Sequence, residues 1–282
     1  MIPTESTVKR YRSYITHDLH THTHLSLCCS APGIADTYIR DAEKRGLHIL
    51  GFSDHMWDRA VALPSKSEFY EKQDFAHICA IKNEITYRTD KVRVLFGAET
   101  DFCHAETLGI SRETAEQLDF LLVPHSHTHM LDFVMPREYD NNIPLHADYL
   151  VRSFSALCRH PMRDLITSIA HPFLPIAKDR EYANRIFDAV TDEQFTECFE
   201  AAAEAKIGFE INTSYFYGIK DEPERILNDG YMRVLSIAKQ CGCAFSLGSD
   251  AHGLEGLDSI ELAALIMARL DITDRDFIPS VR

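Results

Sequence analysis

The sequence has no apolar run near the roughly 18 residues that a membrane span needs, and its first residues, MIPTESTVKRYRSY, lack the apolar core of a signal peptide. These absences predict a cytoplasmic protein that binds no membrane. The chain also lacks the CxxC spacing of a structural zinc site, because its nearest cysteines are the pairs Cys28/Cys29 and Cys241/Cys243. Its cysteines are scattered and follow no secretion signal, which predicts reduced thiols.

Positive charge is scarce. Lysine and arginine number 29 against 43 aspartates and glutamates, which gives a formal net charge of −14. A chain with that charge repels a phosphate backbone, so we expect no nucleic-acid binding. A small anionic substrate stays compatible with this charge, because bound cations would supply positive charge locally.

No Pro/Gly/Ser-rich linker, low-complexity segment or break in composition divides the 282 residues. Hydrophobic residues make up 45% of the chain and charged residues 26%, which is typical of a globular protein with a buried core. We therefore predict a single domain over residues 1–282.

Short apolar or alternating runs are separated by helical patterns, the order expected of repeated βα units. The predicted strands are Tyr14–Leu19, His48–Ser53, Val92–Glu99, Phe120–Pro124, Ile166–Ala170, Gly208–Asn212 and Ala244–Gly248. Seven such units favour an α/β fold in which a parallel sheet closes, or nearly closes, into a barrel. An open doubly wound sheet is the alternative.

Helices between these strands carry end signals. Gly46 ends a predicted helix over Ala35–Arg45, and a capping box at Thr191 opens a helix that runs to Lys206. A third helix is predicted over Glu224–Gln240. In a parallel barrel, long connections after strands lie over the mouth where substrates bind, and three are expected there: Met130–Ala147, Phe173–Val190 and Ser214–Asn228.

Histidines gather at strand ends. Of the 15 histidines, these are at or just past a predicted strand end: His17, His20, His22, His24, His55, His125, His127, His129, His171 and His252. The carboxyl ends of barrel strands surround a common axis, so side chains distant in sequence meet there. We read the remaining histidines as surface or satisfied core residues.

The first polar cluster is an HxH motif. His20 and His22 project to the same side of a strand, so both can reach one ion, and neutral imidazoles suit zinc, iron or manganese. A chance HxH at a polar strand end is the alternative. The direction of His24 is left open.

Carboxylates and further histidines end the other strands. Glu99 can bridge two ions or serve only as a helix cap. Asp250 and His252 repeat the spacing of the HxH motif. Pro172 holds His171 out of helical conformation at a strand tip, and we expect Asn212, with Glu210, to contact ligands or substrate.

In this order, the segments DLHTHT, GFSDH, GAE, HSH, AHP and GSDAH resemble the PHP (polymerase and histidinol phosphatase) family, over the span from Asp18 to His252. The resemblance implies a distorted, TIM-like (β/α)7 barrel that holds two or three divalent ions, zinc, iron or manganese. It also implies the ligands of three ion positions: His20, His22, Glu99 and Asp250 at the first; Glu99, His127 and His171 at the second; His55 and His252 at the third.

The sequence departs from the family pattern in two places. Cys28 stands where a further ligand of the third position is usual, and it is either a thiolate ligand or a structural thiol. The Gly-Leu-Arg-Lys run of the histidinol-phosphatase branch is missing after Asn212, and Lys178, Arg180, Lys220 or Arg225 could substitute for it from nearby loops. His125 and His129 flank His127, which leaves the register of that ligand open.

The resemblance predicts hydrolysis of a small phosphate monoester, in which a metal-bound hydroxide attacks phosphorus. Asp250 and His252 are the candidates for moving protons, and Arg180, Asn212 and Lys220 are the candidate substrate contacts. Two alternatives are an amidohydrolase or deaminase that uses the same ions, and a metal-binding module without catalysis. The oligomeric state is left open.

Overall fold

The computed structural model describes residues 2–29, 35–104 and 106–282. Its strands are β1 (His17–Thr21), β2 (Ile49–Phe52), β3 (Arg93–Phe96), β4 (Ala98–Glu99), β5 (Phe102–Cys103), β6 (Thr107–Leu108), β7 (Leu121–Leu122), β8 (Ser168–Ile169), β9 (Gly208–Asn212) and β10 (Phe245–Gly248). All but the β5–β6 hairpin pair in parallel, so the predicted α/β fold is confirmed.

The parallel strands form two sheets, in the orders β1-β2-β3 and β10-β9-β8-β7-β4. One residue, Gly97, separates β3 from β4, so the predicted strand Val92–Glu99 is one segment that leaves the first sheet and joins the second. A Cβ at Gly97 would lie 2.5 Å from the ring of Phe120. The bend therefore depends on glycine, because any side chain there would collide with the core.

β1 and β10 lie side by side at the remaining seam. The backbone N–H of Leu247 donates to His17 Nε2 at 2.9 Å, and that of Ser249 donates to Asp18 Oδ1 at 3.0 Å. Burial lowers the pKa of His17 to about 3, which keeps its imidazole neutral and able to accept. Within the described residues no strand ladder joins β1 to β10, but an isolated parallel bridge pairs Thr21 with Ala251, and the backbone N–H of His22 donates to Ala251 O at 2.9 Å. The strands thus follow a distorted barrel in which the two sheets meet here without a continuous ladder.

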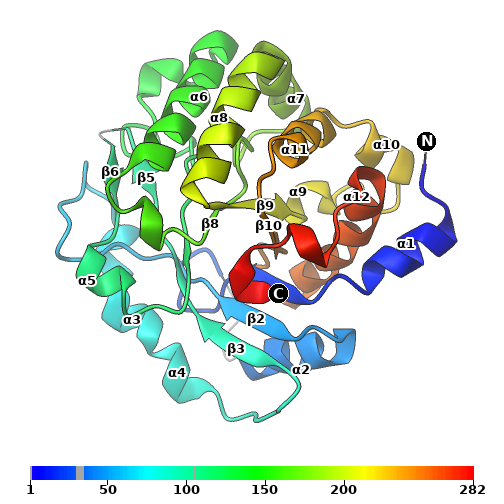
Figure 1. The fold of residues 1–282 in the computed structure, drawn as a ribbon. Helices are drawn as coiled ribbons and strands as arrows, with labels where there is room; N and C mark the ends of the chain where they lie inside the picture. The colour runs from blue at the N-terminus through cyan, green and yellow to red at the C-terminus, as the bar shows by residue number, and fades with distance from the viewer. Residues whose placement is uncertain (1, 30–34, 105) are drawn as a thin grey trace.

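Helices surround the strands (Figure 1). They are α1 (Glu5–Arg12), α2 (Ala35–Arg45), α3 (Phe75–Cys79), α4 (Ile81–Glu84), α5 (Arg112–Ala115), α6 (Ile143–Arg159), α7 (Arg180–Ala189), α8 (Asp192–Ala205), α9 (Ser214–Tyr217), α10 (Pro223–Leu227), α11 (Gly230–Gln240) and α12 (Ala263–Leu270). In the part of the chain that the structure describes, none of them is long and apolar enough to cross a bilayer.

Two helix predictions are confirmed. α2 has the predicted bounds, and Thr191 forms the predicted capping box with Gln194 at the start of α8. The prediction of one helix over Glu224–Gln240 is wrong. The chain leaves helical conformation between α10 and α11, where the Asp229 side chain accepts from the backbone N–H of Tyr231 and starts a new helix.

The three long connections are also more ordered than predicted. Phe173–Val190 contains α7, whose first turn is capped by the side chain of Asp179. Ser214–Asn228 contains α9 and α10, and α6 begins inside Met130–Ala147. Short helices that carry their own caps were hidden by the polar composition of these segments.

A small group of buried side chains lies apart from the main core. We call it the satellite cluster, and it consists of Trp57, Tyr70, Cys103, Phe133 and Val134. Its residues come from the segments after β2, β4 and β7, so it covers part of the strand-end face. Partly buried apolar residues pack against it: Val61, Leu63, Phe69 and Met130.

Candidate metal centre

His20 and His22 lie at the end of β1 and point the same way. Their Nε2 atoms are 3.0 Å apart, and both side chains are fully buried. Zn–N bonds of about 2.0–2.1 Å would place two ligand nitrogens roughly 3.3 Å apart. Asp250 Oδ1 lies 3.4 Å from each of the two nitrogens. The three side chains therefore have the spacing of a shared cation site.

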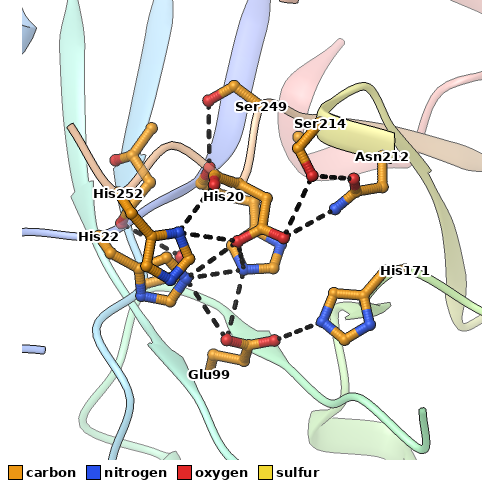
Figure 2. A network of polar contacts seen from close by, with 12 residues as sticks. His20, His22, Glu99, His171, Asn212, Ser214, Ser249 and His252 are labelled. Atoms are coloured by element: carbon orange, nitrogen blue, oxygen red, sulfur yellow. Dashed lines mark hydrogen bonds and ion pairs between the residues drawn. The ribbon is translucent and has the colours of Figure 1, made fainter. Parts of the chain in front are cut away.

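Glu99 at the end of β4 contacts several imidazoles of the cluster (Figure 2). Its Oε2 is 3.4 Å from Nε2 of both His20 and His22 and 3.0 Å from His55 Nδ1. Its Oε1 lies 2.9 Å from His171 Nε2. Because Oε2 is buried without a hydrogen bond, the donor set fits a divalent cation that would satisfy this oxygen.

Three overlapping groups of potential ligand atoms are close enough to hold an ion: His20, His22 and Asp250; His20, Glu99 and His171; His22, His55 and His252. They correspond in part to the three predicted positions. The third group contains His22 in place of Cys28. In the second group His20 takes the predicted place of His127, whose Nε2 is 3.8 Å from Glu99 Oε1.

In four histidines of the cluster, the Nδ1 atom contacts a second polar group while Nε2 faces the possible ligands. Such a contact orients a metal ligand and fixes its tautomer. The pairs are His20 Nδ1 with Glu210 Oε1 at 2.7 Å, His22 Nδ1 with Ser26 Oγ at 3.2 Å, His127 Nδ1 with Asp101 Oδ1 at 2.7 Å, and His171 Nδ1 with Ser126 Oγ at 2.7 Å.

Two of the strand ends have unusual backbone conformation. His171 has φ of 30° and Asp250 has φ of 51°, a region that non-glycine residues adopt only when surrounding contacts hold them there. The backbone N–H of His171 donates to Glu210 Oε2 at 2.6 Å. Glu210 thus orients His20 with one oxygen and holds the strained strand end with the other.

Burial and nearby carboxylates compete for the protonation of two imidazoles. Burial opposes a charge on His20, but Glu210 and Asp250 outweigh it and raise its pKa well above the ordinary value. Burial also opposes a charge on His127, yet Asp101 raises its pKa, with further carboxylates, to about 9. These two imidazoles carry protons that an incoming cation would displace.

The pKa values of two histidines at the mouth of the cluster shift in the opposite direction. Burial lowers the pKa of His55 well below its ordinary value, and burial together with His22 lowers that of His252. Burial opposes ionisation of Glu99 and Asp250, but the surrounding imidazoles lower the pKa of both carboxyls well below their usual range. His55 and His252 are thus neutral and Glu99 and Asp250 are ionised, the forms that bind cations, whereas His20 and His127 must first lose a proton.

The structure separates the three histidines after β7. His125 packs between Phe154 and Phe173, and its Nε2 accepts from the backbone N–H of Phe173 at 3.1 Å. It faces the aromatic core, so the prediction that it could be a ligand is not supported. His127 faces the cluster, while the exposed His129 lies beside it with ring centroids 5.6 Å apart.

Cys28 is an exposed free thiol and belongs to none of the three ligand groups. Its neighbour Cys29 donates through Sγ to the backbone oxygens of His22 and His252. The cysteine that contacts this part of the centre is therefore Cys29, and its contacts are to the backbone.

The candidate substrate contacts have different surroundings. Asn212 Nδ2 lies 3.1 Å from Glu210 Oε2 and 3.3 Å from Asp250 Oδ2, within the centre. Arg180 is held by Asp229 at 2.9 Å and lines an open cavity of about 1000 Å³ beside α7 and α10. Lys220 lies over the ring of Tyr217. Only Asn212 of the three directly contacts a residue of the ligand groups.

Sequence reasoning missed the supporting residues Ser26 and Ser126. No sequence pattern marks Ser26 as a supporting residue, although its hydroxyl also donates to Asp54 Oδ1 at 2.7 Å. Ser126 stands between two histidines of the HSH segment, which was the one signal that could have drawn attention to it. Serine is too common beside turns for either contact to be foreseen.

The PHP domain family model matches residues 18–214. No curated protein matches the chain. Among solved structures, it is similar to a histidinol phosphate phosphatase from Lactococcus lactis complexed with zinc, L-histidinol and phosphate, at 18% identity and a TM-score of 0.57, over 90% of this chain and 93% of that one. It is also similar to a Listeria monocytogenes protein assigned as a histidinol phosphatase, at 12% identity and a TM-score of 0.59, over 86% and 97%.

The family match begins at Asp18, just before the HxH motif, and ends at Ser214, beyond Glu210 and Asn212. It therefore includes the strand ends that supply all the ligand groups except Asp250 and His252. The structural likeness extends over most of the chain and agrees with the ring of parallel strands. The chain belongs to the PHP domain family.

Proposed function

We propose that this protein is a metal-dependent phosphoric monoester hydrolase with two or three zinc, iron or manganese ions at the strand-end cluster. The observation that carries the proposal is the buried, unbonded Oε2 of Glu99, which faces imidazole nitrogens of His20, His22 and His55. The family match and the zinc, L-histidinol and phosphate of the Lactococcus relative support it.

Divalent ions at such a centre would lower the pKa of bound water and neutralise charge on phosphoryl oxygens. The chain's own residues would hold and orient these ions. Glu99 and Asp250 would supply carboxylate oxygens, and Glu210 would fix the direction of His20. Asn212 would steady Asp250 through the contact of its Nδ2 with Oδ2, at 3.3 Å.

Proton transfer to the leaving alcohol needs a group that reaches the mouth of the centre. The side chain of His252 is 37% exposed, and its Nδ1 lies 2.9 Å from the backbone oxygen of Asp250. That contact fixes the ring, and it leaves Nε2 free to carry a proton when the third ion position is not filled. We propose His252 for this role, with Asp250 as its carboxylate partner at 3.6 Å.

The substrate we propose is a small phosphorylated molecule. Among the described residues, the hydrogen bonds and ion pairs of the ligand groups include no lysine or arginine. Recognition of the phosphoryl group would therefore depend on the ions themselves. We further propose that residues 1–282 form one barrel domain, and the eight free cysteines suit the reducing cytoplasm.

The test is elemental analysis of protein purified without chelator, followed by assays against a panel of phosphate monoesters and amides. His20→Ala is compared with a matched control, His48→Ala, because His48 is exposed and lies before the start of β2, at the opposite end of that strand from His55. We expect at least one bound ion per chain, phosphatase activity that chelation removes, and loss of both only in His20→Ala. Less than one ion after reconstitution, amide hydrolysis alone, or ion binding without turnover would each overturn the proposal.

A further inference from the structure

A chain of three contacts runs from the satellite cluster to the proposed metal centre. The phenol of Tyr70 donates to Asp101 Oδ2, and Asp101 Oδ1 lies 2.7 Å from His127 Nδ1. The Nε2 of His127 then faces Glu99 Oε1 at 3.8 Å. All four side chains are buried.

The Asp101 carboxylate depends on both of its partners. Its side chain is completely buried, and each oxygen has one described contact, with His127 on one side and Tyr70 on the other. A buried carboxylate oxygen without a donor is costly. Without the phenol, Asp101 would have to turn toward another donor and could no longer keep its position beside His127.

The ring of Tyr70 is well placed to hold its hydroxyl still. It packs against Trp57 with centroids 5.5 Å apart and stacks on Phe133 at 5.4 Å. Burial and the nearby Asp101 raise the pKa of Tyr70 well above its ordinary value, so the phenol keeps its proton and donates it. The aromatic packing thus fixes the direction from which Asp101 receives its hydrogen bond.

We propose that Tyr70 is a positioning residue that fixes Asp101 and, through it, the His127 imidazole for binding an ion. The inference rests on the proposed metal-dependent function. A carboxylate that accepts from the far nitrogen of a histidine orients the ring and makes the facing nitrogen a better ligand. Tyr70 extends this support outward by one residue and joins it to the satellite cluster.

The experiment is a zinc titration of the full chain in competition with a chromophoric chelator, on wild type and on Tyr70→Phe. We expect one zinc ion to bind about 10–100-fold more weakly in Tyr70→Phe, the loss typical of a disturbed support contact, with the remaining ions unchanged. Phosphatase kcat should fall at limiting zinc and recover at excess zinc with KM unchanged, which a merely structural tyrosine would not produce.

Tyr11→Phe is the matched control. Tyr11 is also 2% exposed and donates its phenol to an aspartate, Asp271, where α1 packs against the end of α12. The Tyr11→Phe variant should bind zinc with wild-type affinity. Asp101→Asn is the second variant, and its zinc affinity should fall at least as far, with no further loss when it is combined with Tyr70→Phe.

The outcomes separate the two proposals. If wild type binds zinc and Tyr70→Phe binds it equally, Tyr70 has no positioning role, and the same conclusion follows if the losses in the double variant simply add. If wild type itself binds no zinc, and elemental analysis finds no iron or manganese either, the proposed function fails. Should Tyr70→Phe fail to fold, zinc binding by a folded Asp101→Asn with wild-type affinity would still overturn the inference.

Discussion

Glu99 Oε2 lies 3.0 Å from His55 Nδ1, yet neither of these buried atoms has a hydrogen-bond partner among the described residues. Two facing polar atoms that form no hydrogen bond are stable together when both bind a third partner. A cation held by both residues would supply that partner, because it would accept a lone pair from each.

This relationship predicts the effect of Glu99→Gln. The amide keeps the size of the side chain but removes the charge and one of the two acceptor oxygens. We expect loss of at least one ion, and a fall in phosphatase kcat greater than the roughly 10–100-fold expected for a support residue. Ion content per chain and kcat at saturating metal are the measurements. Retention of both, with an unchanged circular dichroism spectrum, would exclude a bridging role for Glu99.

The aromatic surroundings of His125 predict a contrast with His127. Because His125 packs between Phe154 and Phe173, His125→Ala should lower the free energy of unfolding by about 2–4 kcal/mol, as for other large-to-small core substitutions. Zinc affinity per folded chain should stay unchanged. His127→Ala should weaken zinc binding at little cost to the stability of the metal-free protein.

Urea unfolding and zinc titration of both variants check this contrast. The reverse pattern, with weakened zinc binding in His125→Ala and normal binding in His127→Ala, would mean that the register after β7 is shifted by two residues.

The directions of the histidines after β7 could not be predicted from the sequence, whereas those at the end of β1 could. The side chains of His20 and His22 were predicted correctly to point the same way, because β1 runs through Thr21 and alternation in a strand is a local property. β7 ends at Leu122, before the histidines begin. Once the chain is no longer extended, alternate residues need not share a face, and tertiary packing alone decides that His125 turns into the core.

The supporting contacts were still less accessible from sequence. Asp101 touches His127 across 26 positions of the chain, and Tyr70 touches Asp101 across 31. Such pairs arise from the order of strands in the ring, which periodicity does not reveal. The seven predicted strands were accessible, because each is a short apolar or alternating run, although β1 spans His17–Thr21 where Tyr14–Leu19 was predicted.

Zinc affinity should depend on pH in a defined direction. His127 has a pKa raised to about 9 in the metal-free protein, so below that pH an ion must displace its proton. Apparent affinity at this position should rise by up to about tenfold per pH unit per proton displaced, and the part of this rise that is due to His127 should level off above pH 9. His55, whose pKa is lowered, is already neutral and should add no such slope.

The same shift affects stability. A folded-state pKa raised from 6.5 to about 9 stabilises the metal-free protein below pH 6.5, and that contribution is lost as the pH rises through 9. Zinc titrations between pH 6 and pH 10, with released protons followed by an indicator dye, measure the linkage. Binding that is independent of pH would show that His127 is neutral before the ion arrives, contrary to the raised pKa.

Phe69 predicts which leaving groups the centre prefers. It lies edge-on to His55, with ring centroids 5.3 Å apart, and is only partly buried against the satellite cluster. An apolar or aromatic leaving group beside His55 would cover this surface, and aromatic contacts of that kind contribute about 0.5–1.5 kcal/mol. Phe69→Ala should therefore lower kcat/KM for an aryl phosphate roughly 2–10-fold, mainly through KM, while glycerol phosphate should be affected little.

The ratio of the two substrates is the informative quantity, because a general disturbance of the ions would lower kcat/KM for both. Phe69→Leu is the matched variant, since leucine keeps an apolar surface without the ring, and it should retain most of the preference. Equal losses for p-nitrophenyl phosphate and glycerol phosphate in Phe69→Ala would mean that Phe69 supports His55 and does not contact the substrate.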